Sequence, residues 1–371
     1  MPEEAMPTPH KRRVRYSGTH PTRYDQKYKE LQPDKYRETI EKVIRKGGTP
    51  AGMHRSVMVQ EALKALDIRP GEQGLDCTLG YGGHTQAMLG ALGNDAKGHL
   101  YALDIDPIES EKTEARLRAA GYGADQLTIL HRNFAQLADI AKETGRFDFI
   151  MADLGVSSMQ IDDPARGFSF KADGPLDLRM NPTAGQSAAE RLQELSRDEL
   201  IGCFEDNADE PYAEEIAAEL TRRKRKGEQI ETTTALRETI AAALLRVKEI
   251  KSLSDDERQE AVRKSCARVF QALRIDVNHE YESLYALLEA LPGALKPGGR
   301  VVILTFHSGE DRLVKRAFKD GIKAGVYTEI SDPPLRPSPE ECFQNSRARS
   351  TKLRFALRSK LDTDQTSGLI K

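Results

Sequence analysis

Short apolar runs alternate with amphipathic segments along the chain from residue 54 onward. Four of these runs predict buried strands, which begin at Gly74, Gly98, Leu127 and Phe147. The segments between them carry apolar residues at helical spacing, and Pro107 stands where a helix would begin. Strands that alternate with helices in this way favour an α/β fold, with a parallel sheet covered by helices on both faces.

The alternation stops after residue 182 and returns toward the C-terminus. Amphipathic helices are predicted at 188–195, 198–205, 212–226, 233–248 and 255–264. A helix over 267–291 then leads back to the sheet and ends at Pro292-Gly293. Further strands are predicted at 298–306, 324–330 and 351–357, with a helix at 310–320. We therefore expect a core over 54–182 and 265–358, interrupted by an all-helical insertion over 183–264.

The two ends of the chain differ from this pattern. Residues 1–53 are basic and interrupted by prolines, with tyrosines among the cations, and 359–371 form a short tail. A basic arm with tyrosines suits phosphate contact and base stacking. A solvated extension fits the same composition equally well.

Composition excludes several classes of protein. The chain has 371 residues, of which 38% are hydrophobic and 31% charged, so it can bury a core beneath a polar surface. No apolar run approaches the roughly 18 residues of a membrane span, and no apolar signal segment precedes the core. The four cysteines are far apart, which argues against disulfides and a metal site and favours the cytoplasm. The net charge of -2 leaves nucleic-acid binding open.

A long polar loop, 153–180, follows the fourth predicted strand. Glycines and prolines interrupt it, so it cannot be a single helix. It is rich in Asp, Ser and Arg side chains that bind and orient ligands, with Phe168 and Phe170 among them. Open α/β sheets place their sites in such loops at the C-terminal ends of strands. We therefore expect this loop to belong to the functional site.

The ends of the first four predicted strands carry residues suited to one nucleoside cofactor. The first strand runs into Asp76-x-x-x-Gly80-x-Gly82-Gly83, where glycines let the backbone approach a ligand closely. Asp104 ends the second strand, and a carboxylate there accepts hydrogen bonds from ribose hydroxyls. Phe134 is placed to pack on an adenine face, and Asp153 ends the fourth strand. This set suits S-adenosylmethionine.

Simpler roles stay open for several of these residues. Asp106 can cap the helix that begins at Pro107, His84 can be a helix-start residue, and Phe134 can be a core residue. An oxidoreductase that binds NAD is disfavoured, because the third glycine of G-x-G-x-x-G would fall at Thr85.

Blocks of residues spread over 54–358 are similar to one known family. They are Gly82-Gly83-His84, Asp104-Ile-Asp-Pro107, Asp153-Leu-Gly-Val-Ser-Ser158, Arg166-Gly-Phe-Ser-Phe170, Asp173-Gly-Pro-Leu-Asp177, Phe270-Gln-Ala-Leu-Arg-Ile275, Val277-Asn278, Phe306-His-Ser308, Glu310-Asp-Arg312, Val314-Lys315 and Arg347-Ala-Arg-Ser350. In this order and spacing they resemble the bacterial ribosomal RNA small-subunit methyltransferase H family. Its members transfer a methyl group from S-adenosylmethionine to N4 of a cytosine in the decoding centre of 16S rRNA.

The resemblance implies a fold, a cofactor and a partner. The fold is a Rossmann-like class I S-adenosylmethionine-dependent methyltransferase core with an inserted helical domain for RNA recognition. The partner is 16S rRNA or the small ribosomal subunit. We expect no membrane contact and no metal ion, and a homodimer is one possible oligomeric state. The resemblance places cofactor contacts at Gly82, Gly83, His84, Asp104, Phe134, Asp153 and Gln160.

The chain departs from the family pattern in and beside the insertion. Asn207-Ala-Asp-Glu-Pro-Tyr212 stands where the family usually has Tyr-Gly-Glu-Glu-Arg-Phe. Lys264-Ser-Cys-Ala-Arg268 stands in place of His-Pro-Ala-Thr-Arg, and Gly309 in place of a usual leucine. With the extra N-terminal residues and a short proline-rich loop, these departures indicate a diverged branch.

Methylation of a cytosine amine requires that the enzyme position the base and that a nearby group accept a proton from the amine. We hypothesise that Asp153 and the 154–158 turn receive the amine, with Asp153 also near the methionine amino group. His307 and Ser308 would hold the base edge, although a structural role fits His307 too. Phe168 or Phe170 would stack on the unstacked base or pack in the core. The candidate phosphate contacts are Arg166, Arg179, Arg274, Arg312, Lys315, Arg347 and Arg349.

Two other functions fit part of the pattern. An amino-methyltransferase acting on another RNA or on DNA would need the same core. A non-catalytic RNA-binding factor of ribosome assembly would keep the fold without cofactor binding. The intact Asp104, Asp153 and glycine turn count against the second function.

Overall fold

The computed structural model describes residues 56–93 and 97–361, which belong to one compact unit. The predicted basic extension, 1–53, lies outside the described residues, as do residues 362–371 of the predicted tail. Helices with the length and apolarity that a membrane span requires are absent from the described residues.

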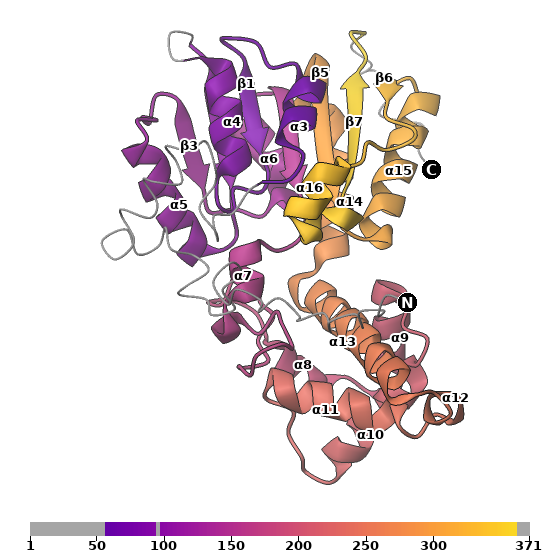
Figure 1. Ribbon diagram of the computed structural model, residues 1–371. Helices are drawn as coiled ribbons and strands as arrows, with labels where there is room; N and C mark the ends of the chain where they lie inside the picture. Colours follow the sequence, from indigo (N-terminus) through magenta and orange to yellow (C-terminus); the bar gives the residue numbers. More distant parts are fainter. Residues whose placement is uncertain (1–55, 94–96, 362–371) are drawn as a thin grey trace, which may run out of the picture. The chain divides into compact units, whose positions relative to one another are not determined.

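A sheet of seven strands in the order β3-β2-β1-β4-β5-β7-β6 forms the core of the described residues (Figure 1). The strands are β1 (Gln73–Asp76), β2 (His99–Leu103), β3 (Leu127–Leu130), β4 (Phe147–Asp153), β5 (Leu295–Thr305), β6 (Tyr327–Ile330) and β7 (Lys352–Arg358). Each lies where the sequence predicts a strand, so these predictions are confirmed.

The last strand corrects the expectation of a parallel sheet. β1 to β5 are parallel, whereas β7 runs antiparallel to both β5 and β6. The segment 331–351 joins β6 to β7 without the crossover that parallel neighbours need, so β7 returns in the opposite direction.

Helices cover both faces of the sheet, as the alternation predicts. Successive strand side chains point to opposite faces, so Val301 and Val302 are buried in two different apolar clusters. One cluster includes side chains of α6 (Leu137–Thr144), α14 (Glu280–Ala294) and α15 (Ser308–Lys323). The other includes side chains of α3 (Val59–Leu66), α4 (Gly83–Leu92) and α5 (Pro107–Ala119).

Six further helices form a lobe beyond the edge at which the parallel strands end (Figure 1). They are α8 (Ala188–Glu194), α9 (Arg197–Ala208), α10 (Ala213–Arg225), α11 (Thr233–Leu244), α12 (Lys248–Lys251) and α13 (Asp255–Asn278). α8, α9 and α13 begin with Ser-x-x-Glu capping boxes at Ser187, Ser196 and Ser254, which fix where these helices start. The apolar cluster of the lobe also contains Leu176 and Leu273, so its packing extends beyond 183–264 on both sides.

The helix boundaries differ from the predictions at several points. α13 is one helix where we expected a break near Ser265, because Ser265 and Cys266 are buried within it and no breaker interrupts it. The chain turns instead at His279, whose φ of 49° ends α13 before α14 begins. The sequence analysis did not predict α6 or five shorter elements. These are η2 (Phe134–Gln136), α7 (Ser158–Asp162), η3 (Pro164–Arg166), α16 (Pro339–Gln344) and η4 (Ser346–Ser350).

Asn278, the last residue of α13, fastens the 153–180 loop to the lobe. Its Oδ1 accepts from the Met180 N–H at 2.7 Å, and its Nδ2 donates to the carbonyls of Leu178 at 2.7 Å and Arg274 at 2.8 Å. Leu178 is buried with a φ of 63°, a left-handed conformation that is unfavourable for leucine. The side chain of Asn278 therefore helps to hold the loop in a strained conformation.

We expect Asn278→Ala to lower the free energy of unfolding by about 1–3 kcal/mol, because it leaves partly buried backbone groups without partners. Urea unfolding monitored by circular dichroism measures this loss. The control is Glu282→Ala, an exposed position on the neighbouring helix α14. Equal stability of the two variants would contradict the role given to Asn278.

Candidate functional site

Three carboxylates meet where β1, β2 and β4 end. Asp76 is buried, and its Oδ1 accepts from the Thr78 N–H at 3.0 Å. The hydroxyl of Thr78 in turn accepts from the Asp153 N–H at 2.7 Å. Asp104 accepts from the Gly80 N–H at 2.8 Å, so the turn after β1 bridges to the end of β2. The predicted row of strand-end residues is therefore brought together at one edge.

The glycine turn is shaped by its contacts with α5. Gly82 has a φ of 82°, and a Cβ there would lie 2.8 Å from the Thr113 methyl carbon, so only glycine fits without movement. The hydroxyl of Thr113 donates to the Gly80 carbonyl at 2.6 Å. Thr85, which replaces the dinucleotide-type glycine, is buried and donates to Asp76 Oδ2 at 2.7 Å. Thr85 therefore has a structural role, which is to hold the side chain of Asp76.

Asp104 has capacity left for a ligand. Its two oxygens accept from the N–H groups of Gly80 and Asp106, each at 2.8 Å. A carboxylate offers about four acceptor positions, so further hydroxyl groups can donate to it. Removal from solvent raises the pKa of Asp104 to about 6, and the two backbone N–H groups oppose that shift. Asp104 is therefore an acceptor near neutral pH and loses that capacity in acid.

Asp153 ends β4 beside the side chain of His84, at the start of α4. The His84 Nε2 lies 3.6 Å from Asp153 Oδ2. Removal from solvent, together with the negative charges of Asp76 and Glu310, raises the pKa of Asp153 to about 8. A carboxyl group that changes protonation near neutral pH can take up a proton from a substrate.

His307 and Glu310 form a pair at the end of β5. The His307 Nε2 lies 3.1 Å from Glu310 Oε1, and the Phe306 N–H donates to Glu310 Oε2 at 2.8 Å. Burial raises the pKa of Glu310, but His307, Arg274 and the Phe306 N–H outweigh it, so the pKa is lowered overall. β4 and β5 are paired parallel strands with Asp153 opposite Leu304, so the two strand ends are close, as predicted. Ser308 is exposed at the start of α15.

Asp106 connects this edge to the 153–180 loop. It caps α5 by accepting from Ile108 and Glu109, which confirms the capping interpretation. Its Oδ2 also accepts from Gln160 Nε2 at 2.8 Å and from Arg166 Nη1 at 2.7 Å. The Gln160 amide is thus used within the protein, because its Oε1 accepts from the Ser157 N–H as well. A cofactor contact of Gln160 stays a prediction.

Several predicted phosphate contacts are instead held in internal ion pairs. Arg166 is buried, and its Nη2 donates to the carbonyls of Arg179 and Met180, so a phosphate role is corrected to a structural one. Three further candidates form ion pairs at 2.6–2.7 Å: Arg179 with Asp177, Arg274 with Glu280 and Arg347 with Asp162. Local sequence cannot reveal the pairs of Arg166 and Arg347, because their partners lie 60 and 185 positions away in the chain. Arg312, Lys315 and Arg349 are exposed and stay candidates for RNA contact.

The aromatic candidates divide into two groups. Phe170 packs on Phe270 with ring centroids 5.4 Å apart, and Phe168 packs on the same apolar cluster of the lobe. Both rings are partly buried, so packing against the lobe is shown for each, and stacking of either ring on a base stays a prediction. Phe134 is partly buried against the sheet cluster, which leaves its adenine contact a prediction.

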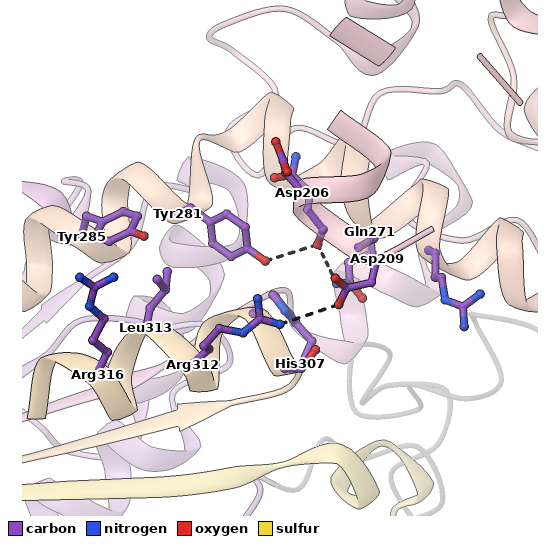
Figure 2. Close-up of a pocket in the computed structure, with 14 residues that line it drawn as sticks. Asp206, Asp209, Gln271, Tyr281, Tyr285, His307, Arg312, Leu313 and Arg316 are labelled. Atoms are coloured by element: carbon purple, nitrogen blue, oxygen red, sulfur yellow. Dashed lines mark hydrogen bonds and ion pairs between the residues drawn. The ribbon is translucent and has the colours of Figure 1, made fainter. Parts of the chain in front are cut away.

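Two of the departures from the family pattern, at residues 207–209 and at Gly309, line one cavity of about 610 Å³ (Figure 2). Asn207 and Asp209 at the end of α9, Arg268 of α13 and Gly309 of α15 all line it, next to His307. A Cβ at Gly309 would lie 2.0 Å from Tyr281 Oη, so a leucine there would displace Tyr281. Positions that are scattered along the chain thus belong to one surface.

Sequence reasoning missed Asp76, Thr78 and Glu310. Asp76 and Glu310 stand inside motifs that we quoted, but neither was given a role. Their significance depends on distances across strands, such as the 2.7 Å between Thr78 Oγ1 and the Asp153 nitrogen. A polar residue at a buried strand end is the signal that could have indicated Asp76.

Comparison with known proteins adds family membership to this geometry. The model of the MraW methylase family matches residues 51–359. A relative from Agathobacter rectalis, named ribosomal RNA small subunit methyltransferase H 1, is 60% identical over 94% of this chain and 98% of its own length. One of the same name from Lachnoclostridium phytofermentans is 57% identical over 96% of each chain.

A relative from Koribacter versatilis, named ribosomal RNA small subunit methyltransferase H, is 40% identical over 82% of this chain and 94% of its own length. The more similar relatives thus match a longer part of this chain than the less similar one does, which supports the diverged branch. The chain therefore belongs to the MraW methylase family, and it is an S-adenosylmethionine-dependent methyltransferase.

Proposed function

We propose that this protein methylates N4 of a cytosine in small-subunit ribosomal RNA, with S-adenosylmethionine as the methyl donor. The observation that carries the proposal is the geometry of the strand ends, where Asp153 lies beside His84 at the edge that also holds Asp104 and the glycine turn. The relatives named ribosomal RNA small subunit methyltransferase H support the substrate class.

The residues at the strand ends fit the cofactor. The free acceptor positions of Asp104 suit the ribose hydroxyls, and the turn at Gly80–Gly83 leaves backbone close to a ligand. Asp153 and His84 would lie toward the methionine part. When bound, S-adenosylmethionine supplies a methyl group activated on a positively charged sulfur.

Asp153 would act on the amine of the cytosine. The lone pair of that amine is conjugated with the ring, so it attacks poorly until an acceptor takes one of its hydrogens. Asp153 would accept this proton as the new nitrogen–carbon bond forms. A positive charge nearby lowers a carboxyl pKa, so ionised Asp153 is favoured when the donor is bound.

His307 would position the base rather than accept its proton. The lowered pKa of Glu310 keeps that carboxyl charged, and its 3.1 Å contact with His307 Nε2 orients the imidazole ring. An oriented ring can donate to a base edge beside Asp153. The small-subunit substrate also leads us to propose a cytoplasmic location, while the homodimer stays a prediction.

We expect purified protein to form N4-methylcytidine in small ribosomal subunits taken from cells that lack this enzyme. Labelled S-adenosylmethionine reports the transfer, and mass spectrometry of the digested rRNA identifies the nucleoside. Cofactor binding without transfer to subunits or to free rRNA would favour an amino-methyltransferase acting on another RNA or on DNA. Absence of cofactor binding in calorimetry would favour a non-catalytic assembly factor.

We expect Asp153→Asn to lower turnover by roughly 10²–10⁴-fold, the usual contribution of a positioned base. In the wild type, kcat/KM for the cofactor should rise about tenfold per pH unit from about pH 6, below which Asp104 is also protonated, to the Asp153 pKa of about 8, and level off above it, since the ionised form is active. The asparagine variant should lose this dependence. Normal turnover in Asp153→Asn would show that Asp153 is not the proton acceptor.

We expect Asp104→Asn to weaken S-adenosylmethionine binding by roughly 10- to 100-fold, because a charged acceptor is lost. Wild-type affinity should also fall as the pH drops below about 6, where Asp104 becomes protonated. Calorimetry over a pH series measures both effects. Asp139→Asn, an exposed carboxylate on α6, serves as the control, and equal affinities for the two variants would contradict the ribose contact.

A further inference from the structure

The cavity beside His307 lies between α14, which contributes tyrosines, and α15, which contributes arginines. Tyr281 and Tyr285 lie one turn apart on α14, and Arg312 and Arg316 lie one turn apart on α15. Figure 2 shows the tyrosines and the arginines on facing sides of the cavity. We call this the α14–α15 groove, lined by these four side chains and open toward His307.

The groove side chains are accessible. Tyr285 is 57% exposed, which is unusual for a large aromatic ring without a partner to cover it. The side chains of Arg312 and Arg316 are 70% and 82% exposed. A ligand can therefore reach both the rings and the guanidinium groups without a rearrangement of the core.

The acidic residues near the groove do not block an anion. Arg312 lies 3.9 Å from Asp209, and Arg316 lies 3.8 Å from Asp320. Exposed ion pairs at such distances contribute little, so a phosphate can replace either carboxylate partner. Asp206, also in the lining, offers an acceptor for a base amino group.

The combination of rings and cations matches single-stranded nucleic acid. Such strands bind where aromatic side chains stack on bases and nearby cations contact the backbone. The cavity volume of about 610 Å³ is that of a small-ligand site. The cavity lies next to His307 at the end of β5, and β5 pairs with β4, which carries Asp153, so a strand whose target base enters beside Asp153 can continue into the cavity.

We propose that the α14–α15 groove binds a nucleotide adjacent to the target, with its base stacked on Tyr285 and its phosphate held by Arg312 and Arg316. This inference rests on the proposed function, because it assigns the neighbour of the base at that site. Tyr281 supports the platform, since its hydroxyl donates to the Asn207 carbonyl at 3.3 Å and fixes the ring against α9. Gly309 leaves the space that Tyr281 occupies.

The first test measures the affinity for a fluorescently labelled single-stranded RNA with a central cytosine by anisotropy. Tyr285→Ala should bind about 5- to 150-fold more weakly, as expected for one lost stack. Tyr285→Phe should bind like the wild type, because stacking uses the ring and not the hydroxyl. Wild-type affinity in Tyr285→Ala would overturn the proposal.

The second test compares two exposed cations of α15. Arg316→Gln should weaken binding and reduce the slope of log affinity against log salt by about 0.7, the value for one phosphate of a single strand. Lys323→Gln is the matched control, because Lys323 also lies near Asp320 and is 77% exposed but does not line the groove. Equal slopes in the two variants would overturn the phosphate contact.

Methyl transfer to subunits separates this inference from the proposed function. One outcome is that the wild type forms no N4-methylcytidine while Tyr285→Ala binds RNA more weakly than the wild type does. That result would contradict the proposed function and support RNA binding in the α14–α15 groove. If the wild type is active and both groove variants bind RNA and methylate as it does, the groove fails alone. Slower methylation of subunits with unchanged affinity for RNA would mean that the groove contacts a ribosomal protein, which would also overturn the proposal.

Discussion

The buried carboxylate of Asp106 is the contact on which the arrangement of the site depends. It is 1% exposed and meets the Arg166 guanidinium at 2.7 Å and the Gln160 amide at 2.8 Å. Removal of one partner from a buried ion pair costs about 3–5 kcal/mol, because the other charge is left uncompensated. Asp106 also caps α5 and donates its own N–H to Asp104. One side chain thus joins the cofactor edge of the sheet to the loop that follows β4.

The same contacts continue into the helical lobe. Arg166 donates to the Met180 carbonyl at 2.8 Å, and the Met180 N–H donates to Asn278 at the end of α13. Because α13 leads directly into α14, this path ends at the helix that carries Tyr281. The position of the lobe is therefore defined relative to Asp104 and Asp153 by hydrogen bonds rather than by apolar contact alone. An enzyme that must bring an RNA base to a small cofactor needs that defined relation.

The sequence predicts the elements of the fold well and their side-chain partners poorly. Apolar runs mark each strand, and Ser-x-x-Glu marks the starts of α8, α9 and α13, because strand burial and helix capping depend on neighbours in sequence. The strand-end carboxylates follow from the topology. The roles of Arg166 and Phe170 do not, since their partners Asp106 and Phe270 are far away in the chain. Charge and aromaticity at those two positions suggested RNA, and tertiary packing gave them structural roles.

The departures from the family pattern and the strand-end carboxylates lie on different elements of the molecule. Asp76, Asp104 and Asp153 lie on strands whose ends are fixed by the sheet, so a change there would disturb cofactor and chemistry together. Gly309 and Tyr281 lie on the groove side, where a side chain at residue 309 and the present position of Tyr281 exclude each other. A side chain at residue 309 would therefore require Tyr281 to move, and its Cβ would also lie 3.2 Å from His307 Nδ1 at the end of β5. The differences at 207–209 and at Gly309 are accommodated beside His307, while Asp76, Asp104 and Asp153 keep the contacts that the sheet and the turn after β1 provide.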